Sequence, residues 1–165
     1  MKSLNIRNAI ETDLDRCFEI ERTSYSGDEA ASKEKIFKRI KTYPTGFVLI
    51  ENDTEIIGFI NSGATDNVEL SNEDFKELIG HDSNGKYIVI MSVVVHPDYQ
   101  GAGMINLLMN SFVNRMKSLG KSEIFLICQA NLINMYKKYG FVQLGLSESN
   151  HGGLSWYEMS LSLKV

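Results

Sequence analysis

The sequence predicts an α/β (α+β) domain: a mixed, mostly antiparallel sheet of six to seven strands with helices on both faces. Two observations lead to this prediction. Short apolar runs of strand length alternate along the chain with stretches of helical periodicity. In the second half, strands over residues 87–95 and 123–128 flank one long helix, which implies parallel pairing, whereas a hairpin over residues 46–62 implies antiparallel pairing.

Length and charge limit the classes of protein that the chain can represent. The 165 residues suit a single domain over residues 1–165, and the net charge of −4 gives no general attraction to nucleic acid or anionic membrane. No apolar run is long enough to span a bilayer, and the first residues lack the apolar core of a signal peptide. Cys17 and Cys128 have no metal-ligand spacing. We expect two buried free thiols and a cytoplasmic protein without a metal.

The first half of the chain reads as a strand, two helices and a hairpin. A weakly alternating strand covers residues 4–9, and Thr12 with Asp15 has the form of a capping box that opens a helix. A polar loop over residues 24–31 leads to a second helix over residues 32–42. Helical spacing predicts that these helices bury Leu14, Cys17, Phe18, Ile36, Phe37 and Ile40. Glu21 lies at the border of this face, where a solvated glutamate is the more common case.

The second half contains the longest strand and the longest helix. A short helix is expected over residues 72–79, before the central strand over residues 87–95. The long helix ends before Gly120, a common helix C-terminal residue. The remaining elements are a strand over 123–128, a short helix over 132–139, and strands over 141–146 and 154–163.

A glycine-containing loop joins the central strand to the long helix. The apolar run ends before Pro97, and Gly101 and Gly103 precede helically spaced apolar residues that begin at Met104. The first N–H groups of a helix have no intrahelical acceptor and carry partial positive charge, and glycine lets an anion approach the backbone closely. The segment 100–106 is therefore a candidate site for a phosphate-bearing ligand.

Two segments resemble the signature of the GNAT acyltransferase superfamily. Gln100-Gly101-Ala102-Gly103-Met104-Ile105 resembles its glycine motif, and Met135 to Phe141 resembles its later helix with a tyrosine and a terminal Gly-Phe. The segments 18–22 and 156–163 are similar to the arylalkylamine N-acetyltransferase branch. The resemblance covers nearly the whole chain and implies the GNAT fold, in which the central strand splays away from its parallel neighbour.

The resemblance also implies that acetyl-CoA binds in that gap as co-substrate. The backbone of the central strand would pair with the pantetheine arm, and the loop N–H groups would hold the pyrophosphate. The implied binding residues are Val93, Val95, Gln100, Gly101, Ala102, Gly103, Met104, Ile105 and Asn106. Ile105 departs from the family pattern, which prefers glycine or alanine there.

The chemistry of acetyl transfer defines which side chains are needed. An alkyl amine has a pKa near ~10 and must lose a proton before it attacks a thioester, while the departing thiolate needs a proton donor. The resemblance places Tyr136 near the sulfur as general acid; the alternative is a packed aromatic residue. The arylalkylamine enzymes carry two histidines where this chain has Val89 and Met91, so no base is assigned and water is expected to carry the proton.

The acceptor is expected to be a small primary amine. Its cleft should lie among the first two helices and the last strands, and the candidate contact residues are Glu21, Tyr25, Phe37 and Met91. Two alternatives stay open: acetylation of a protein N-terminus or lysine, and an acyl-CoA-binding sensor without turnover. Neither nucleic acid nor membrane is an expected partner, and the chain is either a monomer or a homodimer.

Overall fold

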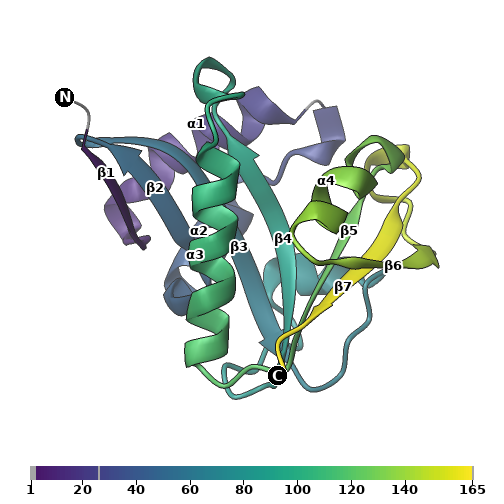
Figure 1. The fold of residues 1–165 in the computed structure, drawn as a ribbon. Helices are drawn as coiled ribbons and strands as arrows, with labels where there is room; N and C mark the ends of the chain where they lie inside the picture. The colour runs from purple at the N-terminus through teal and green to yellow at the C-terminus, as the bar shows by residue number, and fades with distance from the viewer. Residues whose placement is uncertain (1–2, 26, 165) are drawn as a thin grey trace. The chain divides into compact units, whose positions relative to one another are not determined.

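The computed structural model describes residues 3–25 and 27–164 (Figure 1). The chain divides into two compact units, one of residues 1–62 and 92–112 and one of residues 63–91 and 113–165. Hydrogen bonding links seven strands in the order β1-β2-β3-β4-β5-β7-β6. The mixed sheet and the α/β class confirm the prediction from the sequence.

The first unit packs two helices on the antiparallel strands at the start of the chain. Its elements are β1 (Leu4–Asn8), α1 (Leu14–Ser24), α2 (Lys33–Thr42), β2 (Val48–Asn52), most of β3 (Glu55–Thr65) and the end of β4 (Tyr87–Val95). In this unit α1 and α2 cover the face of the sheet opposite to the first turns of α3 (Met104–Ser118) (Figure 1). Ile20, Ile36, Phe47 and Phe59 lie fully buried in one apolar cluster.

The two helices of this unit begin in different ways. Ser32 caps α2, because its side chain accepts a hydrogen bond from the Lys35 N–H at 3.3 Å. The predicted capping box of α1 is wrong: Asp13, not Asp15, accepts from the Ile10 N–H, at 2.8 Å. A 3-10 turn over Glu11–Asp13 therefore precedes α1.

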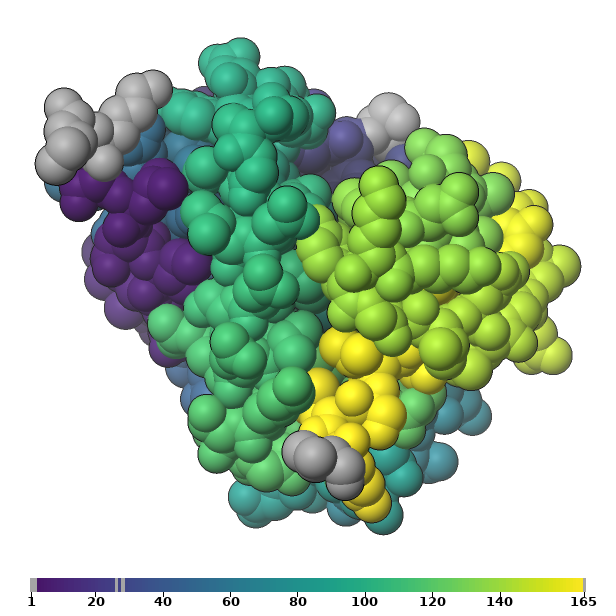
Figure 2. Space-filling view, in the orientation of Figure 1, coloured from purple at the N-terminus to yellow at the C-terminus, as the bar shows by residue number. Residues whose placement is uncertain are grey.

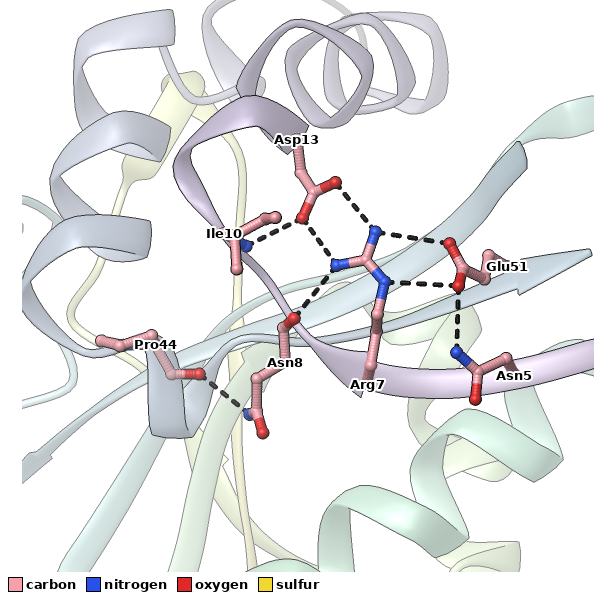
Figure 3. Close-up of polar contacts among 7 residues, drawn as sticks. All are labelled: Asn5, Arg7, Asn8, Ile10, Asp13, Pro44 and Glu51. Carbon is pink, nitrogen blue, oxygen red and sulfur yellow. Dashed lines mark hydrogen bonds and ion pairs between the residues drawn. The ribbon is translucent and has the colours of Figure 1, made fainter. Parts of the chain in front are cut away.

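Arg7 explains why Asp13 is the capping carboxylate (Figure 3). Its Nη1 and Nη2 atoms donate to the two oxygens of Asp13 at 2.8 and 2.9 Å, and Nε and Nη2 donate to Glu51 at 3.3 Å. Burial acts to raise the pKa of Asp13, but the hydrogen bonds from Arg7 and from the Ile10 N–H outweigh it, so this pKa lies below its ordinary value. The cluster joins β1, β2 and the start of α1.

We expect Asp13→Asn to lower the free energy of unfolding at pH 7 by about 1–2 kcal/mol, as for loss of a cap and a partly screened ion pair. Because the folded-state pKa of Asp13 is depressed, its contribution is present above its unfolded pKa and is lost as pH falls toward the folded value. Urea unfolding at several pH values should show a shallower acid loss in the variant. Equal acid slopes in both proteins would contradict the assignment.

The inner face of α2 differs from the prediction at one position. Ile36 and Ile40 are buried as expected, but Phe37 is 37 % exposed and its ring lies 5.7 Å from Lys41 Nζ. Arg39 is buried instead, with 2 % of its surface exposed. The buried contacts of Arg39 with Asn61 and Ser92, described below, explain why Arg39 and not Phe37 is buried.

The second unit contains the remaining strands and α4 (Ile133–Lys138). The start of β4 pairs in parallel with β5 (Glu123–Cys128), and β7 (Tyr157–Ser162) pairs antiparallel with both β5 and β6 (Val142–Leu146). The expected helix over 72–79 is a 3-10 turn, Glu73–Glu77. Gly120, with φ +77°, follows α3, and Gly140, with φ +99°, follows α4, as the sequence indicated.

Both cysteines are buried and free. Among the described residues, no helix combines the length and the apolar composition that a bilayer-spanning segment requires.

Candidate functional site

The end of β4 presents one edge of its backbone away from β3. The His96 N–H donates to the Ile57 carbonyl of β3 at 2.7 Å. Successive residues of a strand direct their N–H and C=O groups to opposite sides. Val93 and Val95 therefore direct their backbone groups away from β3. These are the two residues whose backbone the resemblance assigns to the pantetheine arm.

Two side chains already hold this edge. The Tyr25 hydroxyl donates to the Val93 carbonyl at 3.2 Å, and Gln100 Nε2 donates to the Val95 carbonyl at 3.0 Å. Tyr25 follows the last residue of α1. Two of the predicted site residues, Tyr25 and Gln100, thus meet two others on the same strand. Each carbonyl oxygen keeps a second lone pair for a further donor.

The loop after β4 leads into α3 through two glycines with positive φ. Gly101 has φ +80° and Gly103 has φ +79°, a region that L side chains rarely adopt. A Cβ atom added at either position meets no heavy atom within 4 Å, so open space lies beside both. Residues 101–103 are exposed, and Figure 2 shows the segment before α3 at the surface.

The start of α3 is the segment in which the sequence predicts an anion site. The Leu107 N–H donates to the Gly103 carbonyl at 3.3 Å, which is the i to i−4 bond that opens the helix ladder. The N–H groups ahead of Leu107 precede this ladder. Met104 and Ile105 are half-buried and Asn106 is exposed. The loop therefore offers exposed backbone, open space and a helix start, which fit a diphosphate.

The parallel pairing of β4 with β5 covers only Tyr87 to Val89 on β4 within the described residues. Beyond it, Met91 lines a small cavity of about 20 Å³ together with Val89 and with Ile127 of β5. The cavity has room for about one water molecule. Met91, a predicted acceptor-site residue, thus lies in the second unit where the ladder of these two strands has ended.

Tyr136 lies on α4 in the second unit and is buried. Its ring meets Phe141 edge to face, with centroids 5.7 Å apart, and the Phe141 N–H donates to the Tyr136 carbonyl at 3.2 Å. The Gly140 turn brings Phe141 back onto the helix. The Tyr-Gly-Phe spacing noted in the sequence thus has a packing role.

A buried charged network lies beside β4 in the first unit. Glu21, 1 % exposed, accepts from the Ala31 N–H at 2.8 Å, while Arg39 Nη1 lies 3.4 Å from both Asn61 Oδ1 and Ser92 Oγ. Glu21 Oε1 has no hydrogen-bond partner among the described residues. Glu21 therefore holds the segment between α1 and α2, instead of projecting into solvent.

Burial dominates the electrostatics of this network. It raises the pKa of Glu21, an effect that the Ala31 N–H and Arg39 partly offset. It also lowers the pKa of Arg39 to about 10, against the attraction of Glu21. Each charge partly offsets the cost of burying the other. Arg39 is not among the residues predicted from the sequence, although its spacing from Ile36 is compatible with the inner face of α2.

The described residues contain no group of three His, Cys, Asp or Glu side chains that could hold a metal ion.

Known proteins resemble this chain in sequence over part of its length. Residues 8–141 match the family model described as the acetyltransferase (GNAT) family. A protein of Porphyra purpurea, described as uncharacterized N-acetyltransferase ycf52, is 31 % identical over 74 residues, or 45 % of this chain and 41 % of that protein. The corresponding protein of Pyropia yezoensis is 30 % identical over 74 residues, with the same coverage. The matched region thus spans less than half the length of these curated relatives.

Solved structures share the fold at low sequence identity. The loading GNATL domain of CurA from Lyngbya majuscula superposes with a TM-score of 0.85 at 17 % identity, over 98 % of both chains. The yncA protein of Salmonella typhimurium, solved with its cofactor acetyl-CoA, gives a TM-score of 0.70 at 18 % identity, over 99 % of this chain and 95 % of that one. The family match and the shared fold agree: this chain belongs to the GNAT family of acetyltransferases.

Proposed function

We propose that this protein transfers an acetyl group from acetyl-CoA to a small primary amine, of the kind that the arylalkylamine branch accepts. The observation that carries the proposal is the strand edge of Val93 and Val95 leading directly into the glycine loop and the start of α3. Acetyl-CoA would supply the acetyl group as a thioester. Two free buried thiols agree with a reducing compartment, so we place the protein in the cytoplasm.

The backbone of this segment binds the co-substrate. The N–H groups of residues 101–106 hold the diphosphate, helped by the partial positive charge at the start of α3. The edge of β4 at Val93 and Val95 aligns the pantetheine arm as an added strand. Gln100 fixes the junction, since its side chain donates to the Val95 carbonyl.

The reaction needs two proton movements. The amine nitrogen forms a bond to the acetyl carbon as the carbon–sulfur bond breaks; one proton leaves the nitrogen and one reaches the sulfur. Tyr136 donates to the sulfur, and the Val93 N–H donates to the acetyl oxygen as negative charge develops on it. Water accepts the proton of the amine, because Val89 and Met91 carry no base.

Among the acceptor contacts that we propose, Tyr25 and Phe37 belong to the first unit and Met91 to the second. The contact of Tyr25 with the Val93 carbonyl supports its role. Glu21 acts on the acceptor site by holding the segment that follows Tyr25 through the Ala31 N–H. The site then selects a neutral, partly apolar amine.

The direct test mixes the protein with acetyl-CoA and a panel of primary amines and follows the release of free thiol. We expect turnover with at least one amine. Gly103→Val should weaken CoA binding at least 100-fold, because valine strains a backbone at φ +79° and fills the open space of the loop. Calorimetry with CoA measures this loss.

Gly27→Ala, at a positive-φ glycine in the 3-10 turn Gly27–Glu29, provides the control and should leave CoA affinity unchanged. Failure of the unmodified protein to bind CoA would overturn the proposal. CoA binding without thiol release from any amine would favour the sensor, and turnover limited to peptides would favour a protein acetyltransferase.

A further inference from the structure

The turn between β4 and the glycine loop is bound to β3 at two points. The His96 N–H donates to the Ile57 carbonyl at 2.7 Å, and the Tyr99 hydroxyl donates to a carboxylate oxygen of Glu55 at 3.2 Å. These four residues belong to the first unit, as does the loop over residues 101–106. No step of the proposed reaction uses Tyr99 or Glu55.

Tyr99 is the last residue of the 3-10 turn Pro97–Tyr99, two positions before Gly101. Its N–H donates to the His96 carbonyl at 2.9 Å, and its ring lies edge to face against the His96 ring, with centroids 6.3 Å apart. The backbone, the ring and the hydroxyl of Tyr99 therefore each make a defined contact. Together they determine where the exposed glycine loop begins.

Glu55, the acceptor of the Tyr99 hydroxyl, is itself held by two elements. It is the first residue of β3 and pairs with Asn52 across the β2–β3 hairpin. Arg16 of α1 donates from Nη2 to Glu55 and from Nε to the Ile56 carbonyl, each at 3.0 Å. A planar guanidinium bound at two points restricts the geometry of its partners. Glu55 therefore connects α1 and β3 with the turn before the glycine loop.

The charges at this contact favour a stable hydrogen bond. Removal of water and the hydrogen bond to Glu55 raise the pKa of Tyr99 above its ordinary value, so the hydroxyl remains a donor at neutral pH. The Arg16 guanidinium pairs with the Glu55 carboxylate and balances its charge. The carboxylate can therefore hold a turn that leads to an anion site without adding an uncompensated negative charge there.

A loop that contains two glycines benefits from such a contact. Glycine loses more conformational freedom on ordering than any other residue, and a ligand that orders a loop binds correspondingly less tightly. The side chains of Tyr99 and Gln100 bind Glu55 and the Val95 carbonyl directly before Gly101. They therefore lower the entropy that the loop loses when its N–H groups bind an anion.

We propose that Tyr99 and Glu55 are positioning residues for the diphosphate of the co-substrate. Their hydrogen bond holds the glycine loop in the conformation that binds this group, and Arg16 supports Glu55. The inference rests on the proposed function, because it deepens the role of that loop in acetyl-CoA binding. Neither residue touches the reacting atoms, so their effect is on binding and not on the chemical step.

Tyr99→Phe removes the hydroxyl and keeps the ring that packs against His96. We expect the Kd for CoA, measured by calorimetry, to rise about three- to tenfold, the range of one ordinary hydrogen bond. The kcat at saturating acetyl-CoA should change by less than about twofold, because only binding is affected. Tyr87→Phe, at a half-buried tyrosine of the second unit, is the matched control and should change neither quantity.

Glu55 allows a test by rescue. Glu55→Ala should raise the Kd for CoA as much as Tyr99→Phe does. Glu55→Gln should keep the Kd within about twofold of the unmodified protein, because the amide oxygen still accepts from the Tyr99 hydroxyl. Tyr99→Phe combined with Glu55→Ala should be no worse than either single variant, since both remove one contact. Additive effects would overturn the inference.

A co-substrate without a diphosphate separates positioning of the loop from general damage to the fold. S-acetylpantetheine carries the thioester and the pantetheine arm alone. In Tyr99→Phe, kcat/KM for S-acetylpantetheine should stay within about twofold, while kcat/KM for acetyl-CoA falls by the same factor by which the Kd for CoA rises. Equal losses with both co-substrates would show that Tyr99 supports the fold and not the diphosphate loop.

The outcomes distinguish the two proposals. An unchanged Kd for CoA in Tyr99→Phe would overturn the positioning role and leave the acetyltransferase proposal intact. CoA binding that depends on Tyr99 and Glu55, without thiol release from any amine, would support the positioning role and remove the acetyltransferase proposal. Failure of the unmodified protein to bind CoA would overturn both.

Discussion

We expect Tyr136→Phe to lower kcat about 100-fold, at the lower end of what a general acid contributes. The departing thiolate then leaves without a proton donor, whereas the ring of the residue still packs edge to face on Phe141. The Kd for CoA should stay within about twofold, because the hydroxyl acts on the sulfur as the bond breaks and not on the bound ground state. Thiol release at saturating amine measures kcat, and calorimetry measures the Kd.

Tyr139→Phe is the matched control. Tyr139 lies next to the end of the same helix, and loss of its hydroxyl should change kcat by less than about threefold. Equal kcat values for Tyr136→Phe and the unmodified protein would remove Tyr136 from the acid role. A fall in thermal stability that accounts for the activity loss would have the same consequence.

The second large effect is on stability. Glu21→Gln should lower the free energy of unfolding by about 3–5 kcal/mol, because it removes the negative charge that partly offsets the burial of Arg39. Burial already lowers the pKa of Arg39 to about 10 while Glu21 is present. Glutamine keeps an oxygen for the Ala31 N–H, so the loss reports the charge and not the hydrogen bond.

Chemical unfolding of a double-mutant cycle with Arg39→Met isolates the pair. The double variant should lose about 2–3 kcal/mol less than the two single variants summed. Asp15→Asn, which breaks the exposed ion pair of Asp15 with Lys33, should change stability by less than about 1 kcal/mol. Additive effects of the two core changes would show that Glu21 and Arg39 do not act as a pair.

Local patterns in the sequence predicted most of the elements. The apolar run of β4, the helical spacing of α3 and the glycines after α3 and α4 each act within a few residues, so they are visible without the fold. The Ser32 cap of α2 follows from the same local chemistry. Element order and sheet class then follow from how such elements connect.

Contacts between different elements explain the two features of the helices that the sequence did not predict. Asp13, rather than Asp15, accepts from the Ile10 N–H at the 3-10 turn before α1, and Arg7, on a strand, holds its carboxylate. Arg39, rather than Phe37, faces the interior because Glu21 on another helix compensates its charge. Each partner lies on a different element from the residue that it holds, so periodicity within one helix does not predict either contact.

The candidate site also combines a local sequence motif with contacts that form only in the folded chain. The glycine loop was visible as a motif because backbone conformation requires glycine there. The side chains that hold the strand edge, Tyr25 and Gln100, come into contact with it only in the folded chain.

The hydrogen bonds that Tyr25 and Gln100 donate to the Val93 and Val95 carbonyls also bear on whether the free protein aggregates. An open run of carbonyls and N–H groups at a strand edge is a template on which a foreign strand can add, and aggregation starts from such templates. A phenol and a carboxamide already occupy both outward carbonyls. A molecule without its co-substrate therefore presents no uninterrupted run of free backbone carbonyls to another polypeptide chain. A small ligand can still bind the remaining lone pairs and N–H groups.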